Sequence, residues 1–260
     1  MIDAATLHRA GLRAELAGDV LSVTLDRPET HNAQTPAMWS ALTSIGRAVP
    51  GNVRFVVVRG TGPSFSSGLD TALLAPASGI THIDGNAALP EAEGLALVAE
   101  YQSAFSWLTR PDIVSVAAIQ GHAIGAGFQL ALACDLRIAA DDASLAMPEG
   151  THGLVPDLGG TRPLVRAIGY PRALELCLTG RRVGADEARL SGLVNLVVPR
   201  PDLDAAVADC LSALRATSRT TSTEIKALLS AALSQTAEQQ LASEREGQLR
   251  VLKDGLQNGD

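Results

Sequence analysis

Two glycine-bearing segments carry the residue types that let a backbone bind an anion. They span residues 62–70 (GPSFSSGLD) and 121–127 (GHAIGAG), and each follows an apolar run and precedes a predicted helix. Small residues allow a ligand to approach closely, and free N–H groups at the start of a helix can hold an anion or a developing oxyanion. Two such turns that face each other can place two N–H donors on one oxygen. The alternative is that both are tight strand-to-helix turns whose glycines serve geometry alone.

Two carboxylates, Glu149 and Asp157, flank a short and largely apolar segment, GTHGLVP. A carboxylate in apolar surroundings has a raised pKa and can serve as an acid or a base. Each residue also has an ordinary alternative. Glu149 can be a solvent-facing turn residue, and Asp157 can cap a helix predicted over residues 158–168.

Other catalytic and ligand motifs are absent from the sequence. Neither glycine segment reads G-x-G-x-x-G or G-x-x-x-x-G-K-[ST], so no nucleotide site is predicted. The sequence has no G-x-S-x-G, no H-E-x-x-H and no C-x-x-C, and its five histidines lack the spacing of a helical metal site. We therefore predict no metal in the site, although scattered residues leave a catalytic triad open.

The elements that must position these residues alternate between strand and helix. Apolar alternation and β-branched runs predict strands at 12–16, 20–25, 55–58, 113–119 and 136–140. Helical spacing predicts helices at 36–47 (capped by Asn32 or Thr35), 91–110, 129–134 and 158–168. Residues 71–90 have no clear period and predict a long loop that acts as a lid, and only helices are expected after about residue 202. This order favours parallel strands in an α/β fold.

Composition and charge narrow the class of protein further. The chain has 260 residues, of which 46% are hydrophobic and 19% charged, as expected for a packed core. A net charge of −7 argues against nucleic-acid binding, and no apolar run approaches the ~20 residues of a membrane span. Three widely spaced cysteines and an N-terminus without an apolar signal core predict a cytoplasmic protein. We expect a core at residues 1–200 that carries the site, and a helical region at 201–260.

Several motifs, taken in order, resemble one family. They are LDRP with HNA (25–28 and 31–33), VVRG through FSSGLD (57–70), AAIQGHAIGAG (117–127), CDLRIA (134–139), PE (148–149), GLVP (153–156), GGT (159–161), LTG (178–180) and residues 188–193. The chain thereby resembles the crotonase family, the enoyl-CoA hydratase/isomerase superfamily, over nearly its whole length. The resemblance implies an α/β fold with a ββα-superhelix core and C-terminal helices that assemble a homotrimer or homohexamer. It also implies acyl-CoA thioesters as ligands, with coenzyme A arriving as part of the substrate and no separate cofactor.

The resemblance assigns the chemistry residue by residue. The N–H groups of Ser67 and Ala126 match the family's two oxyanion donors, which hold a thioester carbonyl and stabilise an enolate. Hydratases of the family use two glutamates to activate water and protonate C2, of which the second matches Glu149 and the first falls on Gln129. An amide can hydrogen-bond water but cannot accept its proton. Asp157 matches a position at which some isomerases carry an acidic residue.

The resemblance also implies residues that contact the substrate beside the two turns: Arg27, Ser66, Gly68, Leu69, Asp70 and Gly125. The loop at 71–90 is expected to line the acyl pocket. Its apolar candidates, which core packing explains equally well, are Leu69, Leu73, Leu74 and Trp107.

Together these residues predict double-bond isomerisation of an enoyl-CoA. Glu149 would remove a proton from C2, the thioenolate would be held by the two N–H groups, and C4 would be reprotonated. Two alternatives stay open: a slow hydratase in which Gln129 orients water, and an acyl-CoA-binding protein without turnover.

Overall fold

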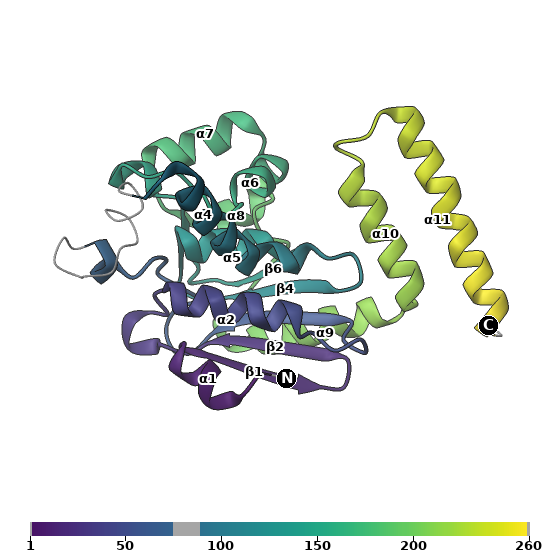
Figure 1. Ribbon diagram of the computed structural model, residues 1–260, viewed down its shortest axis with the longest axis horizontal. Coiled ribbons are helices and arrows are strands. Elements are labelled where there is room, and N and C mark those ends of the chain that lie inside the picture. The colour runs from purple at the N-terminus through teal and green to yellow at the C-terminus, as the bar shows by residue number, and fades with distance from the viewer. Residues whose placement is uncertain (1, 75–88, 259–260) are drawn as a thin grey trace.

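The long apolar strands pair into one six-stranded sheet (Figure 1). The computed structural model describes residues 2–74 and 89–258. The strand order is β1-β2-β3-β4-β6-β9, in which β1 and β2 form the predicted antiparallel hairpin and the remaining neighbours run parallel. The strands are β1 (Leu12–Ala17), β2 (Val20–Leu25), β3 (Phe55–Gly60), β4 (Val114–Ile119), β6 (Leu136–Ala140) and β9 (Leu196–Val198).

A second, smaller sheet has the order β5-β7-β8, with β5 (His122–Ile124), β7 (Ser144–Ala146) and β8 (Val183–Gly184). The chain passes from β4 to β5 and then into helix α5 (Ala126–Ala133), and from β6 to β7 and then into the 3-10 helix η4 (Glu149–His152). An isolated parallel bridge between Ser66 and Ala123 extends the small sheet to the turn after β3. In each repeat, the chain therefore adds a strand to the large sheet, then a segment to the small sheet, and then forms a helix. This is the ββα superhelix that the family resemblance implies.

Both faces of the large sheet are buried, as the continuous apolar runs predict. In β3, Val56 and Val58 face the main core, whereas Phe55 and Val57 face α9 (Leu203–Arg215). Helix α9 covers this second face with apolar residues at i, i+4 and i+8, namely Leu203, Val207 and Leu211. The main core is closed by α2 (Pro36–Arg47) and α4 (Glu91–Ser106), which lie over the opposite face (Figure 1).

The remaining helices are mostly short and lie at the edges of these layers. The α-helices are α1 (Ala4–Arg9), α6 (Thr161–Ile168), α7 (Tyr170–Thr179), α8 (Ala185–Ser191), α10 (Arg219–Ala231) and α11 (Ala237–Asn258). The 3-10 helices are η1 (Pro28–Thr30), η2 (Thr71–Leu74), η3 (Trp107–Thr109) and η5 (Arg200–Asp202). Residues 75–88 of the predicted lid lie outside the described residues.

Three local predictions are refined by tertiary contacts. Thr35, rather than Asn32, caps α2, because its hydroxyl accepts the Met38 N–H at 3.2 Å. The alternative that Asp157 caps a helix is wrong: α6 begins at Thr161, and the residue at its N-cap is Gly160. The glycine segment at 121–127 is more than a turn, since its middle pairs as β5.

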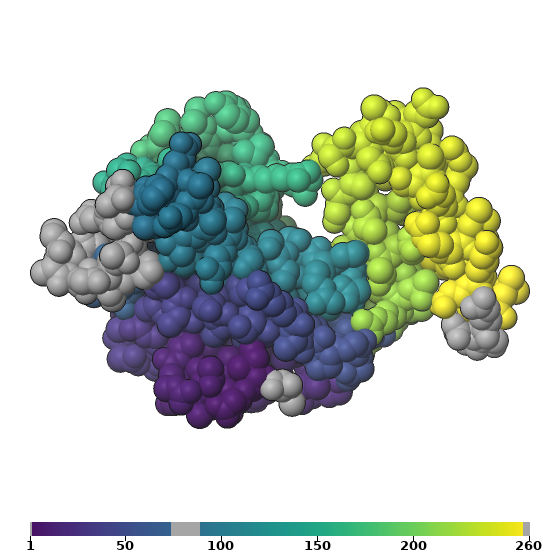
Figure 2. Space-filling view, in the orientation of Figure 1, coloured from purple at the N-terminus to yellow at the C-terminus, as the bar shows by residue number. Residues whose placement is uncertain are grey.

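The chain ends in a hairpin of two helices, α10 and α11, that stands away from the body (Figure 1). Figure 2 shows open space between this hairpin and the teal and green body. The middle of α10 is anchored to the body by Lys226, whose ammonium lies 2.7 Å from Asp135 Oδ2 and donates to the Ile113 carbonyl. Six leucines along the hairpin are exposed: Leu229, Leu233, Leu241, Leu249, Leu252 and Leu256. Within residues 2–74 and 89–258, no helix is long and apolar enough to cross a membrane.

Candidate active site

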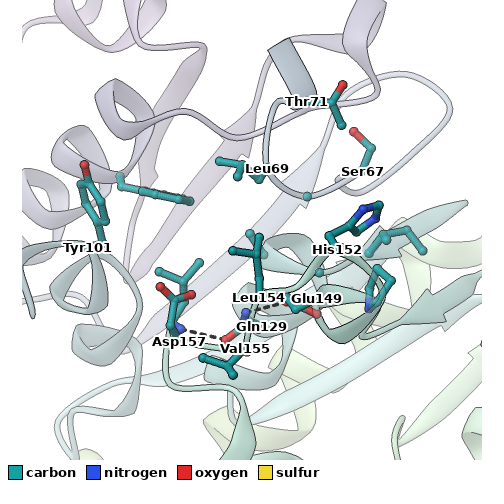
Figure 3. Close-up of a pocket in the computed structure, with 17 residues that line it drawn as sticks. Ser67, Leu69, Thr71, Tyr101, Gln129, Glu149, His152, Leu154, Val155 and Asp157 are labelled. Carbon is teal, nitrogen blue, oxygen red and sulfur yellow. Dashed lines mark hydrogen bonds between the residues drawn. The ribbon is translucent and has the colours of Figure 1, made fainter. Parts of the chain in front are cut away.

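A cavity of about 360 Å³ opens where the two glycine turns meet the segment that carries the two carboxylates (Figure 3). Glu149, Gln129 and Asp157 lie along one wall, with Ser67 and Leu69 on the opposite wall. The full lining is Trp39, Ser67, Gly68, Leu69, Thr71, Tyr101, Ile124, Gly125, Ala126, Gln129, Pro148, Glu149, His152, Leu154, Val155, Asp157 and Leu158. A largely apolar cavity with a few convergent polar groups is the usual form of a small-molecule site.

The two glycine turns are in direct contact, which is the arrangement that two N–H donors on one oxygen would require. Gly68 has a φ of +91°, and a Cβ built on it would lie 2.5 Å from the Ile124 carbonyl oxygen and 3.4 Å from the Ala126 nitrogen. A side chain at residue 68 would therefore push the turns apart. The parallel bridge between Ser66 and Ala123 holds the same two segments together one step earlier in the chain.

The two predicted oxyanion donors differ in their present partners. Ala126 is the first residue of α5, where no preceding turn offers a carbonyl, and its N–H has no acceptor among the described residues. Ser67 also lines the cavity, but its N–H donates to the His31 carbonyl at 2.8 Å. One donor is therefore free for a ligand, whereas the other must exchange or share its acceptor.

Glu149 has the features of a general base. Only 9% of its surface is exposed, so the solvent-facing alternative is wrong. Its Oε1 accepts a hydrogen bond from the Gln129 Nε2 at 2.8 Å, while its Oε2 is buried with no hydrogen-bond partner. Desolvation raises the pKa of Glu149, and the negative charge of Asp157 raises it further, against the opposing effect of the Gln129 hydrogen bond. The carboxyl is thus brought toward the range in which it can exchange protons near neutral pH.

Both polar atoms of the Gln129 side chain form hydrogen bonds with protein groups. Its Oε1 accepts from the backbone N–H of Leu158 at 2.9 Å and of Gly160 at 3.2 Å, and its Nε2 donates to Glu149. The side chain is buried, with 1% of the residue's surface exposed. Both lone-pair positions of the amide oxygen are therefore used before any water binds.

Asp157 lies on the same wall as Glu149, in the loop before α6 (Figure 3). The residue is exposed to solvent, but the protein around its carboxyl group desolvates that group and so raises the pKa of Asp157. Its backbone carbonyl accepts from the Gln102 Nε2 at 2.7 Å, which ties the loop to α4. The structure thus brings together the two carboxylates and the amide that the sequence singled out.

The other predicted contact residues divide between the cavity wall and its support. Gly68, Leu69 and Gly125 line the cavity. Ser66 is fully buried. Its hydroxyl accepts a hydrogen bond from the Gly68 N–H and donates one to the Asn32 carbonyl, so it stabilises the turn.

Arg27 and Asp70 lie outside the cavity wall and pair with each other at 3.0 Å. For these two residues and for Ser66, a substrate contact stays a prediction.

Among the described side chains of the apolar candidates for the acyl wall, only that of Leu69 lines the cavity. Leu73 and Trp107 are buried in the core instead, and the Leu74 side chain lies outside the described residues. The apolar wall is formed by residues that sequence reasoning missed, among them Trp39 and Tyr101, whose rings lie 4.8 Å apart. Helical periodicity marks both as core residues and gives no sign that one edge faces a cavity.

Because Glu149 is buried, its ionisation should lower the stability of the folded protein. Comparison with the Glu149→Gln variant measures this effect. Because the folded-state pKa lies above the ordinary 4.5, the folded protein holds its proton to higher pH than the unfolded chain does. Glu149 therefore costs the wild type stability as pH rises through this window, and the glutamine variant lacks that contribution. Urea unfolding should show the variant gaining on the wild type between about pH 4.5 and about pH 8. An equal difference at both pH values would contradict this expectation.

Comparison with known proteins identifies the relatives of this site. The chain matches the family model described as Enoyl-CoA hydratase/isomerase over residues 15–254. A probable enoyl-CoA hydratase of Rhodobacter capsulatus is 36% identical over 197 residues, which cover 74% of this chain and 70% of the relative. One of Mycobacterium tuberculosis is 34% identical over 183 residues, covering 70% and 66%. The aligned part of the chain thus spans just under two thirds of the mycobacterial relative.

Solved structures agree over almost the whole fold. A Thermobifida fusca protein named for enoyl-CoA hydratase, solved with acetoacetyl-CoA, is 44% identical with a TM-score of 0.91, covering 97% of this chain and 98% of that one. The same protein solved with CoA is 43% identical with a TM-score of 0.91, covering 98% of both chains. With its superhelix, its paired turns and these matches, the chain belongs to the enoyl-CoA hydratase/isomerase family, also called the crotonase family.

Proposed function

We propose that this protein isomerises the double bond of enoyl-CoA thioesters. Glu149 removes a proton from C2 of a 3-enoyl-CoA, and the electrons of that C–H bond pass into a dienolate whose negative charge lies largely on the thioester oxygen. The protonated Glu149 then gives this proton to C4, which leaves a 2-enoyl-CoA of unchanged mass and returns Glu149 to its charged form. The observation that carries this proposal is the single buried, unpartnered oxygen of Glu149, which belongs to a carboxylate on the cavity wall.

The thioester oxygen is assigned to the meeting point of the two glycine turns. There the free N–H of Ala126 and, after exchange of its bond to the His31 carbonyl, the N–H of Ser67 would stabilise the charge of the enolate. The related T. fusca structures with CoA and acetoacetyl-CoA support a CoA thioester as the ligand. The reaction as written needs no cofactor beyond the coenzyme A that the substrate carries.

The contacts of Gln129 favour isomerisation over hydration. Hydration by two acid–base groups needs a second group that binds water and accepts its proton. Gln129 cannot accept a proton, and its amide oxygen is already bonded to two backbone N–H groups. Asp157 is the remaining acid–base group on this wall, and we assign to it a secondary role in the proton transfer.

The test is to incubate the protein with matched 2-enoyl-CoA and 3-enoyl-CoA substrates and resolve the products by mass and retention. Double-bond migration without a change of mass is the expected result. A product heavier by one water would replace the proposal with hydration. Tight binding of both thioesters with no product would leave an acyl-CoA-binding protein.

The exposed α10–α11 hairpin supports a further part of the proposal, assembly as a homotrimer or homohexamer. Its row of exposed leucines forms a surface that a monomer would leave in water. Light scattering on the purified protein gives the number of subunits directly, and a monomeric mass would remove this part of the proposal.

A further inference from the structure

The orientation of the Gln129 amide is determined by its neighbours. Two backbone N–H groups, of Leu158 and Gly160, point at one end of the amide, so this end must be the oxygen. The other end, Nε2, faces Oε1 of Glu149 at 2.8 Å, where only a donor is stable. A flipped amide would set N–H against N–H at one end and oxygen against oxygen at the other.

This single side chain therefore connects the segments that carry the two carboxylates. It bonds to Glu149 in η4 and to Leu158 and Gly160, which lie one and three residues after Asp157. Packing leaves it little freedom, because a Cβ built on Gly160 would lie 2.7 Å from its Cγ. The hydrogen bond also makes the two Glu149 oxygens unequal, since Oε1 is occupied and Oε2 has no partner.

We infer that Gln129 is a positioning residue: it determines which oxygen of Glu149 reacts and holds the Asp157 loop in register with it. An amide is suited to this position because it accepts at one end and donates at the other. A carboxylate at residue 129 would still accept both backbone N–H groups. It would, however, place a second negative charge 2.8 Å from Glu149 Oε1 unless one of the two carboxyls kept a proton.

This inference rests on the proposed function for its kinetic consequences but not for its electrostatic ones. The groups that act on Glu149 come from three surrounding elements. The negative charge of Asp157 in the loop raises the pKa of Glu149, and His152 in η4 lowers it. Cys177 in α7 is close enough for Glu149 to raise the pKa of its thiol. The hydrogen bond from Gln129 acts against the effect of Asp157, so removing one or the other should move the titration of Glu149 in opposite directions.

The experiment compares four variants by infrared titration of the Glu149 carboxyl, identified as the band that Glu149→Gln removes. Gln129→Met takes away the donor, and Gln129→Glu keeps the acceptor for the two N–H groups, so it is the variant that preserves the loop. Both should raise the midpoint of Glu149, while Asp157→Asn should lower it. The matched control is Gln102→Met, which loses another amide bond to the same loop but does not contact Glu149, and it should leave the midpoint unchanged.

The kinetic measurement follows on the same proteins. We expect Gln129→Met to lower kcat by about 10²-fold, with KM changed little, because a small misplacement of a reacting group has effects of this size. The acidic limb of the pH profile should move with the infrared midpoint. If Gln129→Met and Gln129→Glu both titrate and turn over like Gln102→Met, Gln129 only fills space and the inference is overturned.

The infrared result also separates this inference from the proposed function. A wild type that lacks isomerase activity would remove the proposed reaction, while shifted midpoints would still establish the positioning of Glu149. Conversely, active isomerase with midpoints that do not move in the Gln129 variants would keep the reaction and remove the inference.

Discussion

Glu149→Gln is expected to lower the rate of isomerisation by about 10⁴-fold while leaving acyl-CoA binding almost unchanged. Glutamine has nearly the shape of glutamate, and its carbonyl oxygen can still accept the Gln129 Nε2–H at the position of Oε1. It cannot take a proton from C2. General acid–base groups contribute about 10²–10⁴-fold to a rate, and a group that both removes and returns the proton should lie at the upper end of that range.

The residual rate of this variant tests the role of Asp157. Asp157 lies on the same wall and has a raised pKa, so it is the group placed to transfer protons slowly when Glu149 is absent. The double variant Glu149→Gln with Asp157→Asn should therefore be slower than Glu149→Gln alone. Asp157→Asn by itself should keep most of the activity and extend it to lower pH, because loss of that negative charge lowers the pKa of Glu149.

The measurements are kcat on a 3-enoyl-CoA and, for binding, calorimetry with a saturated acyl-CoA. Dissociation constants of the wild type and Glu149→Gln should agree within about threefold, since less than 1 kcal/mol separates them. Full activity in Glu149→Gln would show that another residue is the base. Loss of binding in parallel with activity would show instead that the substitution had disturbed the cavity.

Those parts of the fold and site that depend on local pattern were predictable from the sequence. The hairpin around Gly18, the start of α2 after a cap at Asn32 or Thr35, and the doubly buried β3 each follow from residue types within a few positions of one another. The same is true of the two glycine turns. Their residues mark tight strand-to-helix connections, and parallel strands of one sheet bring such connections to the same edge.

The features that could not be predicted depend on contacts between residues far apart in the chain. Gln129 receives its backbone partners from residues 29 and 31 positions away, so its orientation is a property of the assembled site. The His31 carbonyl that holds the Ser67 N–H is equally remote in sequence. Trp39 belongs to a helix whose pattern indicates core, and only the packed structure shows that it borders the cavity.

Ala126→Pro is expected to lower kcat by about 10²–10³-fold, because it removes one oxyanion donor and no side-chain function. The N–H of Ala126 is the predicted donor that has no acceptor among the described residues, whereas that of Ser67 is bonded to His31. Proline is well tolerated as the first residue of a helix, where its missing N–H interrupts no helical bond.

Ala126→Gly is the matched control, because it changes the side chain and keeps the N–H group. It should retain activity within about fivefold, the cost of a glycine near a helix start being at most about 1 kcal/mol. The infrared band of the thioester carbonyl in a bound, unreactive acyl-CoA supplies a readout independent of turnover. Two N–H donors polarise this carbonyl and lower its frequency, so the band should move less in the proline variant than in the glycine variant. Equal rates and equal band positions in the two variants would mean that the Ala126 N–H does not stabilise the enolate. The negative charge would then be stabilised by other groups near Glu149 and not by the glycine turns.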